Sequence, residues 1–229
     1  MCYIRFGFSP FVYHQLVRDA VDGYRDLVPG GQIKPSSMGS AALIEMVTEG
    51  DLDAALVIML IGKHKLFVQR IRNEKVMICL RRDDPLAQLE SLSKRQVEDR
   101  LRIVFSRDNH PLCHDEIMRK FAKAKIRLTP TDFVSSPADM QLLVKISSGF
   151  GLMFESAPLD AELTLRSVSG LSLQVKTAFI CRSGHQPPVL PLLASRMAKM
   201  YADEAEMSRK KRPVGSVGGE LPRQLPMFA

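Results

Sequence analysis

Residues 36–58 read SSMGSAALIEMVTEGDLDAALVI, which is the pattern of a strand end, a helix and a second strand. Gly39 and Ser40 interrupt the extended segment, and the Ser40 hydroxyl is predicted to accept a hydrogen bond from the N–H groups that open the helix. Apolar residues recur at helical spacing up to Gly50, which favours the left-handed conformation that ends helices. Residues 52–61 are almost continuously apolar, as in a strand covered on both faces. This unit predicts a parallel α/β sheet with a helix N-terminus aimed at a cleft.

The alternation of strands and helices extends on both sides of this stretch. Residues 1–60 have a β-α-β-α-β pattern, with strands at 4–8 and 32–36 and an amphipathic helix at 11–28. Two more strands are predicted at 66–71 and 76–80, separated by a turn at Asn73-Glu74, and a charged segment with a short helix fills 86–100. Such alternation favours parallel strands joined by right-handed helical crossovers.

A second β-α-β-α-β series starts at Leu101. It comprises predicted strands at 101–105, 128–134 and 150–154, helices at 115–125 and 136–148, two strands within 162–181, and a last helix at 189–205. Ser136 is a predicted helix cap, because Pro137 and Asp139 follow it in the first turn.

Two series of similar size predict an α/β fold of two Rossmann-like lobes with mixed sheets and a cleft between them. We expect the first lobe to contain residues 1–79 plus 183–205 and the second to contain residues 80–182. Residues 206–229 are rich in basic residues, glycine and proline, and we expect a disordered tail there.

The charge and hydropathy of the chain exclude some classes of protein. The net charge is +7, but residues 208–229 contribute +4 of it, which leaves too little on the folded part to predict a nucleic-acid surface. The longest apolar run is residues 54–61, far short of the about 20 residues of a membrane helix, and no secretory signal is visible at the N-terminus. We therefore expect a cytoplasmic protein with no membrane partner.

The cysteines and histidines predict neither a metal site nor a catalytic thiol. Cys79 and Cys181 lie in apolar strand-like runs and are predicted to be small buried thiols. The HPLCH motif at residues 110–114 suggests a metal or Cys–His site, but no third ligand stands at a useful spacing, so a solvated loop is the preferred interpretation. His14 and His185 are predicted at the surface or at helix ends. We expect no cofactor and no metal.

An ordered series of short motifs extends through the folded part. These are Ile4-Arg-Phe-Gly-Phe8, Tyr24-Arg-x-Leu-x-Pro29-Gly30, Met38-Gly-Ser40, Gly50-x-Leu-Asp-Ala-Ala55, Asn73-Glu-Lys-Val-Met77, Asp84-Pro-Leu86 and the Leu142 to Met153 region with Gly149 and Gly151. The series resembles the effector-binding region of LysR-type transcriptional regulators over residues 3–205. The resemblance implies a fold like that of type 2 periplasmic binding proteins, a small-molecule effector in the cleft, and self-association as a homodimer or tetramer. Family members bind DNA through a winged helix-turn-helix before this region, and we expect the 229-residue chain to lack it.

Candidate ligand-binding residues follow from the position of the strand ends. In open α/β sheets, ligands bind beyond the carboxyl ends of strands, where helix N-termini present free N–H groups. This rule selects Ser9, Pro10, Phe11, Met38, Gly39, Ser40, Ser106, Arg107, Ser135, Ser136 and Phe154. The set offers hydroxyls, backbone donors, one guanidinium and two aromatic rings, which suits a small organic acid, including an aromatic one.

Simpler interpretations exist for several of these residues. Each serine, Ser136 above all, could serve only as a helix cap, whereas Ser40 also lies at the turn that contacts effectors in the family. Phe11 stands where some members of the family have a small polar residue. If the assignment is right, Ser40→Ala and Arg107→Ala should each weaken ligand binding by roughly 1–3 kcal/mol.

Two other functions compete with a ligand sensor. An enzyme on the same two-lobed fold would need an acid/base pair in the cleft, and the sequence offers no such pair, so we expect no enzymatic activity. Nucleic-acid binding through residues 209–212 would be weak and salt-sensitive, because four basic residues on a flexible tail release few counterions.

Overall fold

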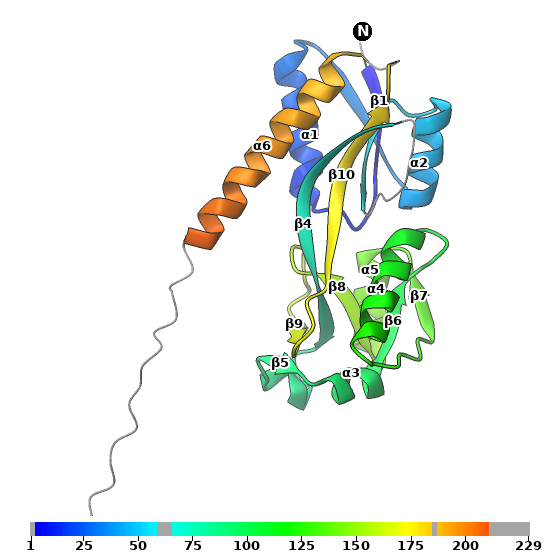
Figure 1. Ribbon diagram of the computed structural model, residues 1–229, viewed down its shortest axis with the longest axis vertical. Coiled ribbons are helices and arrows are strands. Elements are labelled where there is room, and N and C mark those ends of the chain that lie inside the picture. The colour runs from blue at the N-terminus through cyan, green and yellow to red at the C-terminus, as the bar shows by residue number, and fades with distance from the viewer. Residues whose placement is uncertain (1–2, 59–65, 185–186, 211–229) are drawn as a thin grey trace, which may run out of the picture.

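A twisted mixed sheet runs the length of the molecule in the computed structural model, which describes residues 3–58, 66–184 and 187–210 (Figure 1). The strands are β1 Tyr3–Phe8, β2 Gln32–Ser37, β3 Ala54–Ile58, β4 Leu66–Arg81, β5 Ser91–Leu92, β6 Leu101–Phe105, β7 Asp132–Val134, β8 Phe150–Phe154, β9 Leu163–Val168 and β10 Gln174–Arg182. The helices are α1 His14–Leu27, α2 Ser40–Glu49, η1 Pro85–Gln88, α3 Lys94–Arg100, α4 Pro111–Lys123, α5 Pro137–Ile146 and α6 Val189–Lys210.

The sheet contains two parallel sets of strands joined by two long antiparallel strands. Its order is β2-β1-β3-β10-β4-β8-β6-β7, with β9 paired to β4 and to β5. Strand β1 is parallel to β2 and β3, and β6 is parallel to β7 and β8, whereas β10 is antiparallel to both β3 and β4. This arrangement confirms the predicted mixed α/β fold.

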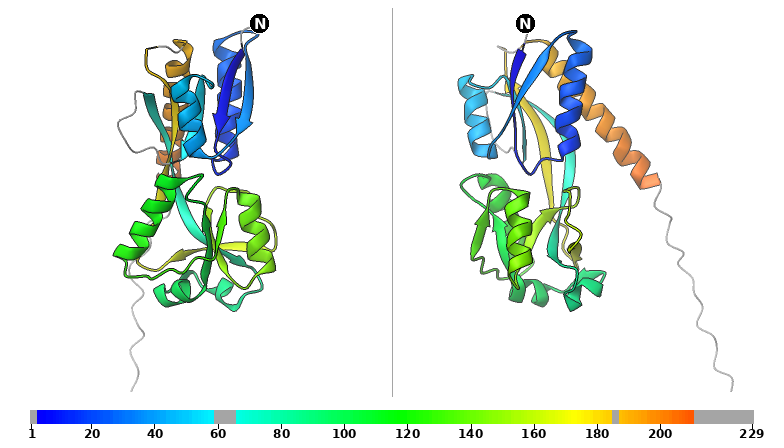
Figure 2. Two further views of the ribbon diagram at one scale, coloured as in Figure 1. Left: turned by 90° about the vertical axis from the view of Figure 1, so that its right-hand side faces the viewer. Right: turned by 180° about the vertical axis from the view of Figure 1, so that it is seen from behind.

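Strands β4 and β10 connect the two halves of the molecule. Figures 1 and 2 show them passing from the half that contains α1, α2 and α6 to the half that contains α3, α4 and α5. Strand β4 pairs with β10 up to Lys75 and with β8 from Val76 onward, so one strand belongs to the sheets of both halves. The exact division of the chain into lobes stays a prediction.

The predicted turn at Asn73-Glu74 is wrong, because β4 continues through both residues. Glu74 is only 1% exposed and accepts a hydrogen bond of 2.7 Å from the Ser156 hydroxyl. Arg72 Nε lies 3.0 Å from the other carboxylate oxygen, close enough for an ion pair but out of line for a hydrogen bond. Burial is the main cause that raises the pKa of Glu74. These contacts place a carboxylate inside a strand, where local sequence patterns favour a turn.

Apolar packing holds both halves together. One cluster of buried side chains extends from Phe6 and Phe179 near α1 to Phe121 and Phe150 in the other half. A second cluster packs α2 against the opposite face of the first sheet, including Leu43, Val47, Ala55, Val57 and Ile180. All five residues of β3 are buried, as predicted for a strand covered on both faces.

The helix boundaries confirm some predicted ends and correct others. Gly50 ends α2 with φ +95°, the left-handed conformation that the sequence predicts. Ser136 caps α5 and accepts a hydrogen bond of 3.2 Å from the Asp139 N–H. The predicted loop at residues 110–114 is wrong, because α4 begins at Pro111, where the missing N–H group costs nothing.

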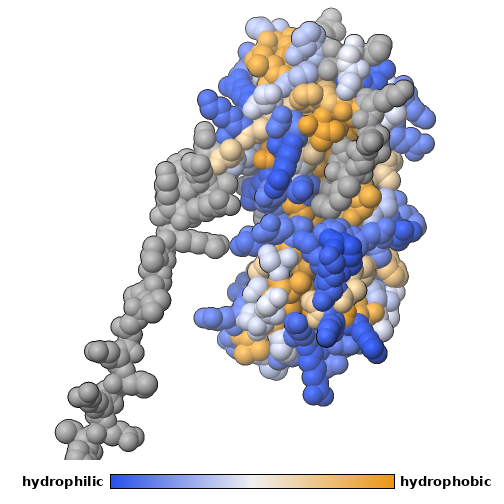
Figure 3. Space-filling model, in the orientation of Figure 1, coloured by the Kyte–Doolittle hydropathy of each residue, from blue (hydrophilic) through white to orange (hydrophobic). Residues whose placement is uncertain are grey.

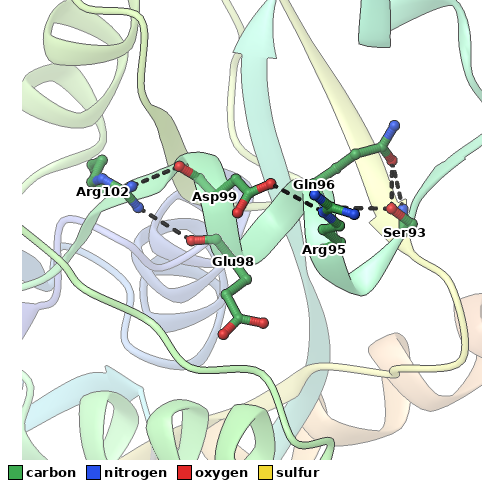
Figure 4. A network of polar contacts seen from close by, with 6 residues as sticks. All are labelled: Ser93, Arg95, Gln96, Glu98, Asp99 and Arg102. Atoms are coloured by element: carbon green, nitrogen blue, oxygen red, sulfur yellow. Dashed lines mark hydrogen bonds and ion pairs between the residues drawn. The ribbon is translucent and has the colours of Figure 1, made fainter.

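The short helix α3 shows how polar side chains fix the connecting segment (Figure 4). Ser93 and Gln96 form a capping box, in which each side chain bonds to the backbone N–H of the other residue. Arg102 donates hydrogen bonds to the carbonyl oxygens of Glu98 and Asp99 at the end of the helix, at 3.3 and 2.6 Å. The predicted short helix in this segment is thereby confirmed.

The last helix is longer than the sequence predicts. It continues to Lys210, whereas the predicted helix ends at residue 205. The expected disordered tail stays a prediction, and residues 211–229 lie outside the described part. His185 and residues 59–61 of the apolar run also lie outside the described residues. Among the described helices, none has the length and hydropathy needed to cross a bilayer.

Candidate functional site

Aromatic rings fill the centre of the gap where strands of the two halves end. Phe11 follows β1 in one half, whereas Phe105 and Phe154 end β6 and β8 in the other. The Phe11 centroid lies 4.8 Å from that of Phe105, 5.2 Å from that of His110 and 5.8 Å from that of Phe154. Each of these four side chains is at most 3% exposed. The centre of the predicted cleft is therefore a packed contact, and not an open polar cavity.

His110 is the unusual member of this aromatic cluster. Neither of its ring nitrogens has a hydrogen-bond partner among the described residues, although both are buried. Burial lowers the pKa of His110 to about 4. The nearby Ser135 backbone acts in the opposite direction and raises this pKa, although it lies outside hydrogen-bond geometry with both ring nitrogens. The imidazole is therefore neutral at pH 7 and leaves one donor and one acceptor unused beside the Phe11 ring.

Asn109 joins the loops of the two halves next to these rings. Its side-chain amide donates hydrogen bonds to the hydroxyls of Ser135 at 2.6 Å and Ser106 at 3.4 Å. The backbone carbonyl oxygen of Asn109 accepts a hydrogen bond of 3.2 Å from the Ala41 N–H at the start of α2. A Cβ atom on Gly39 would lie 2.8–2.9 Å from three atoms of Asn109, so this close approach of the two halves requires glycine.

A cavity of about 290 Å³ lies between the halves beside the aromatic cluster. It is lined by Pro10, Phe11, Val12, Tyr13, His14, Ser136, Pro137, Ala138, Gln141, Ser156, Ala157 and Pro158. The lining is mostly apolar, with the opening turn of α5 on one side, where peptide N–H groups lack a helical acceptor. No lysine or arginine lines it. The cavity can therefore hold a small, largely apolar molecule with one polar or anionic group near α5.

The structure divides the eleven predicted site residues into three sets. Three of them line the cavity, namely Pro10, Phe11 and Ser136. Phe154 packs on Phe11, and Gly39, Ser106 and Ser135 surround Asn109, so these residues lie at the contact between the halves.

The other predicted residues satisfy their own backbone or face elsewhere. The buried Ser9 hydroxyl accepts a hydrogen bond of 3.3 Å from the Phe11 N–H. Ser40 does not cap α2 as predicted; its hydroxyl accepts a hydrogen bond of 3.2 Å from the Ile58 N–H. Met38 packs under α2 with the second apolar cluster.

Arg107 points away from the cavity. Its guanidinium forms two hydrogen bonds to the Asp115 carboxylate, at 2.7 and 3.0 Å, and its side chain is 64% exposed. This contact, assisted by His114, lowers the pKa of Asp115 to about 2. The cation that the sequence predicts for the cleft is therefore neutralised on the surface.

Sequence reasoning missed Asn109 and placed His110 in a solvated loop, although both residues lie at the contact between the halves. The available signal was Pro111, because proline favours the first position of a helix and would have placed both residues directly before a helix start. Asn109 and His110 lie between the end of β6 and the start of α4, which is the kind of position where ligands bind in open α/β sheets.

The thiols of the described part are structural. Cys79, Cys113 and Cys181 are free and buried, which confirms the prediction for Cys79 and Cys181 and corrects the solvated position expected for Cys113. Burial raises the pKa of Cys79 to about 12 and that of Cys181 to about 11, and it raises the pKa of Cys113 as well. Within residues 3–58, 66–184 and 187–210, no group of three or more His, Cys, Asp or Glu side chains could hold a metal ion.

The mixed sheet, with its two parallel strand sets and linking strands β4 and β10, is the fold of type 2 periplasmic-binding-protein-like domains. Residues 3–200 match the family described as the LysR substrate binding domain, and the chain belongs to this family. A comparison with curated proteins found no match to the sequence.

Solved structures with the same fold include regulators of this family. The effector-binding domain of a BenM variant has a TM-score of 0.76 and 20% identity, with 90% of this chain and 97% of that chain covered. The CcmR regulatory domain of Synechocystis PCC6803, in complex with 2-PG, has a TM-score of 0.74 and 11% identity, with 88% and 98% covered. Reduced OxyR from N. meningitidis has a TM-score of 0.70 and 13% identity, with 87% and 95% covered. At these identities the likeness shows the fold alone.

Proposed function

We propose that this chain senses a small organic molecule for a transcription regulator, and that the ligand binds in the 290 Å³ cavity between the halves. The observation that carries the proposal is the position of this cavity. The loop after β1 forms one wall, and the start of α5 with the loop after β8 forms the other. A ligand here touches both halves, so it stabilises one relative arrangement of the two and changes their equilibrium.

The lining favours a small aromatic or aliphatic acid. The rings of Phe11 and Tyr13 and the prolines supply apolar surface, and the first turn of α5 favours a negative group. The carboxylate would be held by these peptide dipoles and not by an arginine, because Arg107 pairs with Asp115 outside the cavity. This lining differs from the set proposed from sequence, in which Arg107 supplied the positive charge.

Self-association and DNA binding complete the proposal. CcmR was solved with 2-PG as a regulatory domain, and CbnR, a LysR family regulator, was solved with its target DNA. We infer that this chain forms homo-oligomers and influences DNA through a separate winged helix-turn-helix, in the cytoplasm. These relatives are regulators rather than enzymes, and we assign no catalytic step to the chain.

A cavity-filling substitution tests the site. Isothermal titration calorimetry with a panel of aromatic and aliphatic carboxylates first identifies a binding compound. Ala138→Phe places a large ring in the cavity and should weaken binding of that compound by about tenfold or more. Ala42→Phe adds the same ring to an exposed position on α2 and should leave binding unchanged. If both variants bind the compound as well as the unmodified chain does, the cavity is not the ligand site.

A further inference from the structure

A second pocket, of about 410 Å³, lies where α4 faces strands β4 and β10. Its lining comes from three elements: Arg70 and Asn73 of β4, Glu116, Arg119 and Lys120 of α4, and Gln174 and Lys176 of β10. Figure 3 shows hydrophilic side chains gathered across the middle of the molecule, in the region where β4 and β10 pass between the halves. This pocket is distinct from the cavity proposed for the effector, with which it shares no lining residue.

A bulge in β4 brings Arg70 to the pocket. The register between β4 and β10 shifts at this point: Thr177 lies opposite Arg72, whereas the next residue, Ala178, lies opposite Arg70. One β4 residue, Ile71, is therefore extra, and it is buried. In a regular strand, residues 70 and 73 would point to opposite faces, because side chains alternate. The extra residue puts both on one face, where the Arg70 guanidinium contacts the Asn73 side-chain oxygen.

Strand β10 and helix α4 each line the pocket with residues that share one face of the element. Gln174 and Lys176 are two residues apart on β10 and share a face of the strand. Glu116, Arg119 and Lys120 are three and four residues apart on α4 and share a face of the helix. Lys120 Nζ donates a hydrogen bond of 3.2 Å to the Gln174 carbonyl oxygen, which holds α4 against the start of β10.

The pocket has a large excess of positive charge. Four cationic side chains line it against one carboxylate, Glu116. Arg119 donates hydrogen bonds to this carboxylate through Nε at 2.8 Å and Nη2 at 2.6 and 2.5 Å, and Lys120 Nζ lies 3.8 Å from it. The hydrogen bonds from Arg119 lower the pKa of Glu116, and one carboxylate is shared by these two cations. Within the described residues, the Lys176 side chain has no ion-pair or hydrogen-bond partner, and the Arg70 side chain contacts an uncharged amide. Elsewhere, arginines such as Arg5 and Arg100 pair with carboxylates. The unpaired charge of this pocket lowers the electrostatic potential energy of an anion there.

We propose that this pocket binds a small polyanion that carries two or more phosphate or carboxylate groups. The Arg70 guanidinium, which contacts an amide oxygen, matches the planar face of such a group, and the Lys176 ammonium supplies a second charge. Arg119 and Lys120 share the single Glu116 carboxylate, so this pair of cations adds to the positive charge as well. A small ligand fits better than a duplex, because the cations converge on one pocket from three elements and do not follow a stripe along one element. The bound anion would join α4 to both connecting strands and so stabilise one position of that half.

Calorimetry on the 229-residue chain at low ionic strength tests the proposal, with pyrophosphate and citrate as probes. Saturable one-site binding of either probe is expected, and the tighter probe distinguishes phosphate from carboxylate recognition. The double variant Arg70→Gln/Lys176→Gln should weaken that binding by about tenfold or more, because it removes two charged donors. Arg18→Gln/Lys34→Gln makes the same change of charge at exposed positions on α1 and β2, and its effect should stay within about twofold.

The outcomes separate this site from the alternatives. Circular dichroism and the thermal midpoint show whether the double variants fold. Both are expected to fold, because all four substituted positions are exposed. If neither probe binds, or if the two double variants weaken binding equally, the pocket is not an anion site. If a duplex of about 20 base pairs binds through Arg70 and Lys176 while neither probe does, the surface is a nucleic-acid contact and the proposal is overturned. Ala138→Phe should leave pyrophosphate binding unchanged, so failure of the effector site would not be mistaken for failure of this one.

Discussion

Phe11 and Phe105 meet edge to face, with their ring centroids 4.8 Å apart and their planes at 77°. The contact joins the loop after β1 in one half to the end of β6 in the other, with both rings almost fully buried. The family resemblance implies that Phe11 stands where some members of the family have a small polar residue. In this chain, the ring takes space at the strand ends, and the open cavity lies beside it.

Phe11→Ser should therefore destabilise the fold and enlarge the cavity. Removing a buried phenyl ring costs roughly 3–5 kcal/mol in the free energy of unfolding, since transfer and cavity terms add. The urea-induced unfolding midpoint measures this loss. Phe133→Ser makes the same change at a side chain that is 56% exposed, and it should cost less than about 1 kcal/mol. Equal losses in the two variants would show that the Phe11 ring is not packed as described.

His110→Phe should change the pH dependence of stability. The pKa of His110 is about 4 in the folded protein and 6.5 in the unfolded chain, so below pH 6.5 the unfolded chain binds a proton that the folded protein does not. The free energy of unfolding should fall as pH drops from 6.5 to 4, by up to roughly 3 kcal/mol from this residue. The phenylalanine variant should lack this part of the dependence and be no less stable at pH 7, because two unpaired buried nitrogens are removed.

Urea titrations of both proteins between pH 4 and 7 make this measurement. The raised pKa of Glu74 gives a slope of opposite sign, but it contributes equally to both proteins and cancels in their difference. Parallel pH profiles for the two proteins would contradict a neutral buried imidazole at position 110.

Arg107→Ala should alter Asp115 and leave ligand binding within about twofold, because the ion pair is exposed and outside the cavity. The Asp115 pKa, measured by NMR titration, should rise from about 2 toward its usual value of 3.8. The folded pKa is depressed, so any stability from the pair is present above pH 3.8 and is lost as pH falls through 2. A tenfold loss of ligand affinity in this variant would restore Arg107 to the binding site, as first expected from the sequence.

Ser40→Ala should affect stability more than binding. The Ser40 hydroxyl is the acceptor for the buried Ile58 N–H, and its removal leaves that donor unpaired at the end of β3. The expected loss is about 1–3 kcal/mol in the free energy of unfolding. Ser37→Ala, at an exposed position on β2, should change stability by less than about 0.5 kcal/mol. An unchanged midpoint for Ser40→Ala together with lost ligand binding would favour a direct ligand contact instead.

Much of the fold could be predicted from local patterns. Gly50 and Ser136 were identified as helix ends because their conformational and capping preferences act within a few residues. The strand at 101–105 and the strand at 150–154 follow from apolar runs alone. Patterns failed at Asn73-Glu74, since the contacts that bury Glu74 come from Ser156, far away in the sequence.

The candidate site was less predictable. Strand-end reasoning selected Pro10, Phe11 and Ser136, which line the cavity, because the ends of parallel strands meet at one edge of a sheet. Their contact with a ligand stays a prediction. It could not show that Arg107 turns outward to Asp115, since the alternative directions of a long side chain differ only through tertiary neighbours.

The sequence by itself determined the alternation of strands and helices, since burial periodicity and turn chemistry are local properties of the chain. The ordered series of short motifs carried the resemblance to LysR effector domains, which implied the mixed α/β class. Only the tertiary structure decided that aromatic rings close the centre of the gap, that Asn109 joins the two halves, and that a bulge aims Arg70 into a cationic pocket. These features depend on which distant residues become neighbours, and that outcome is set by the packing of the whole sheet.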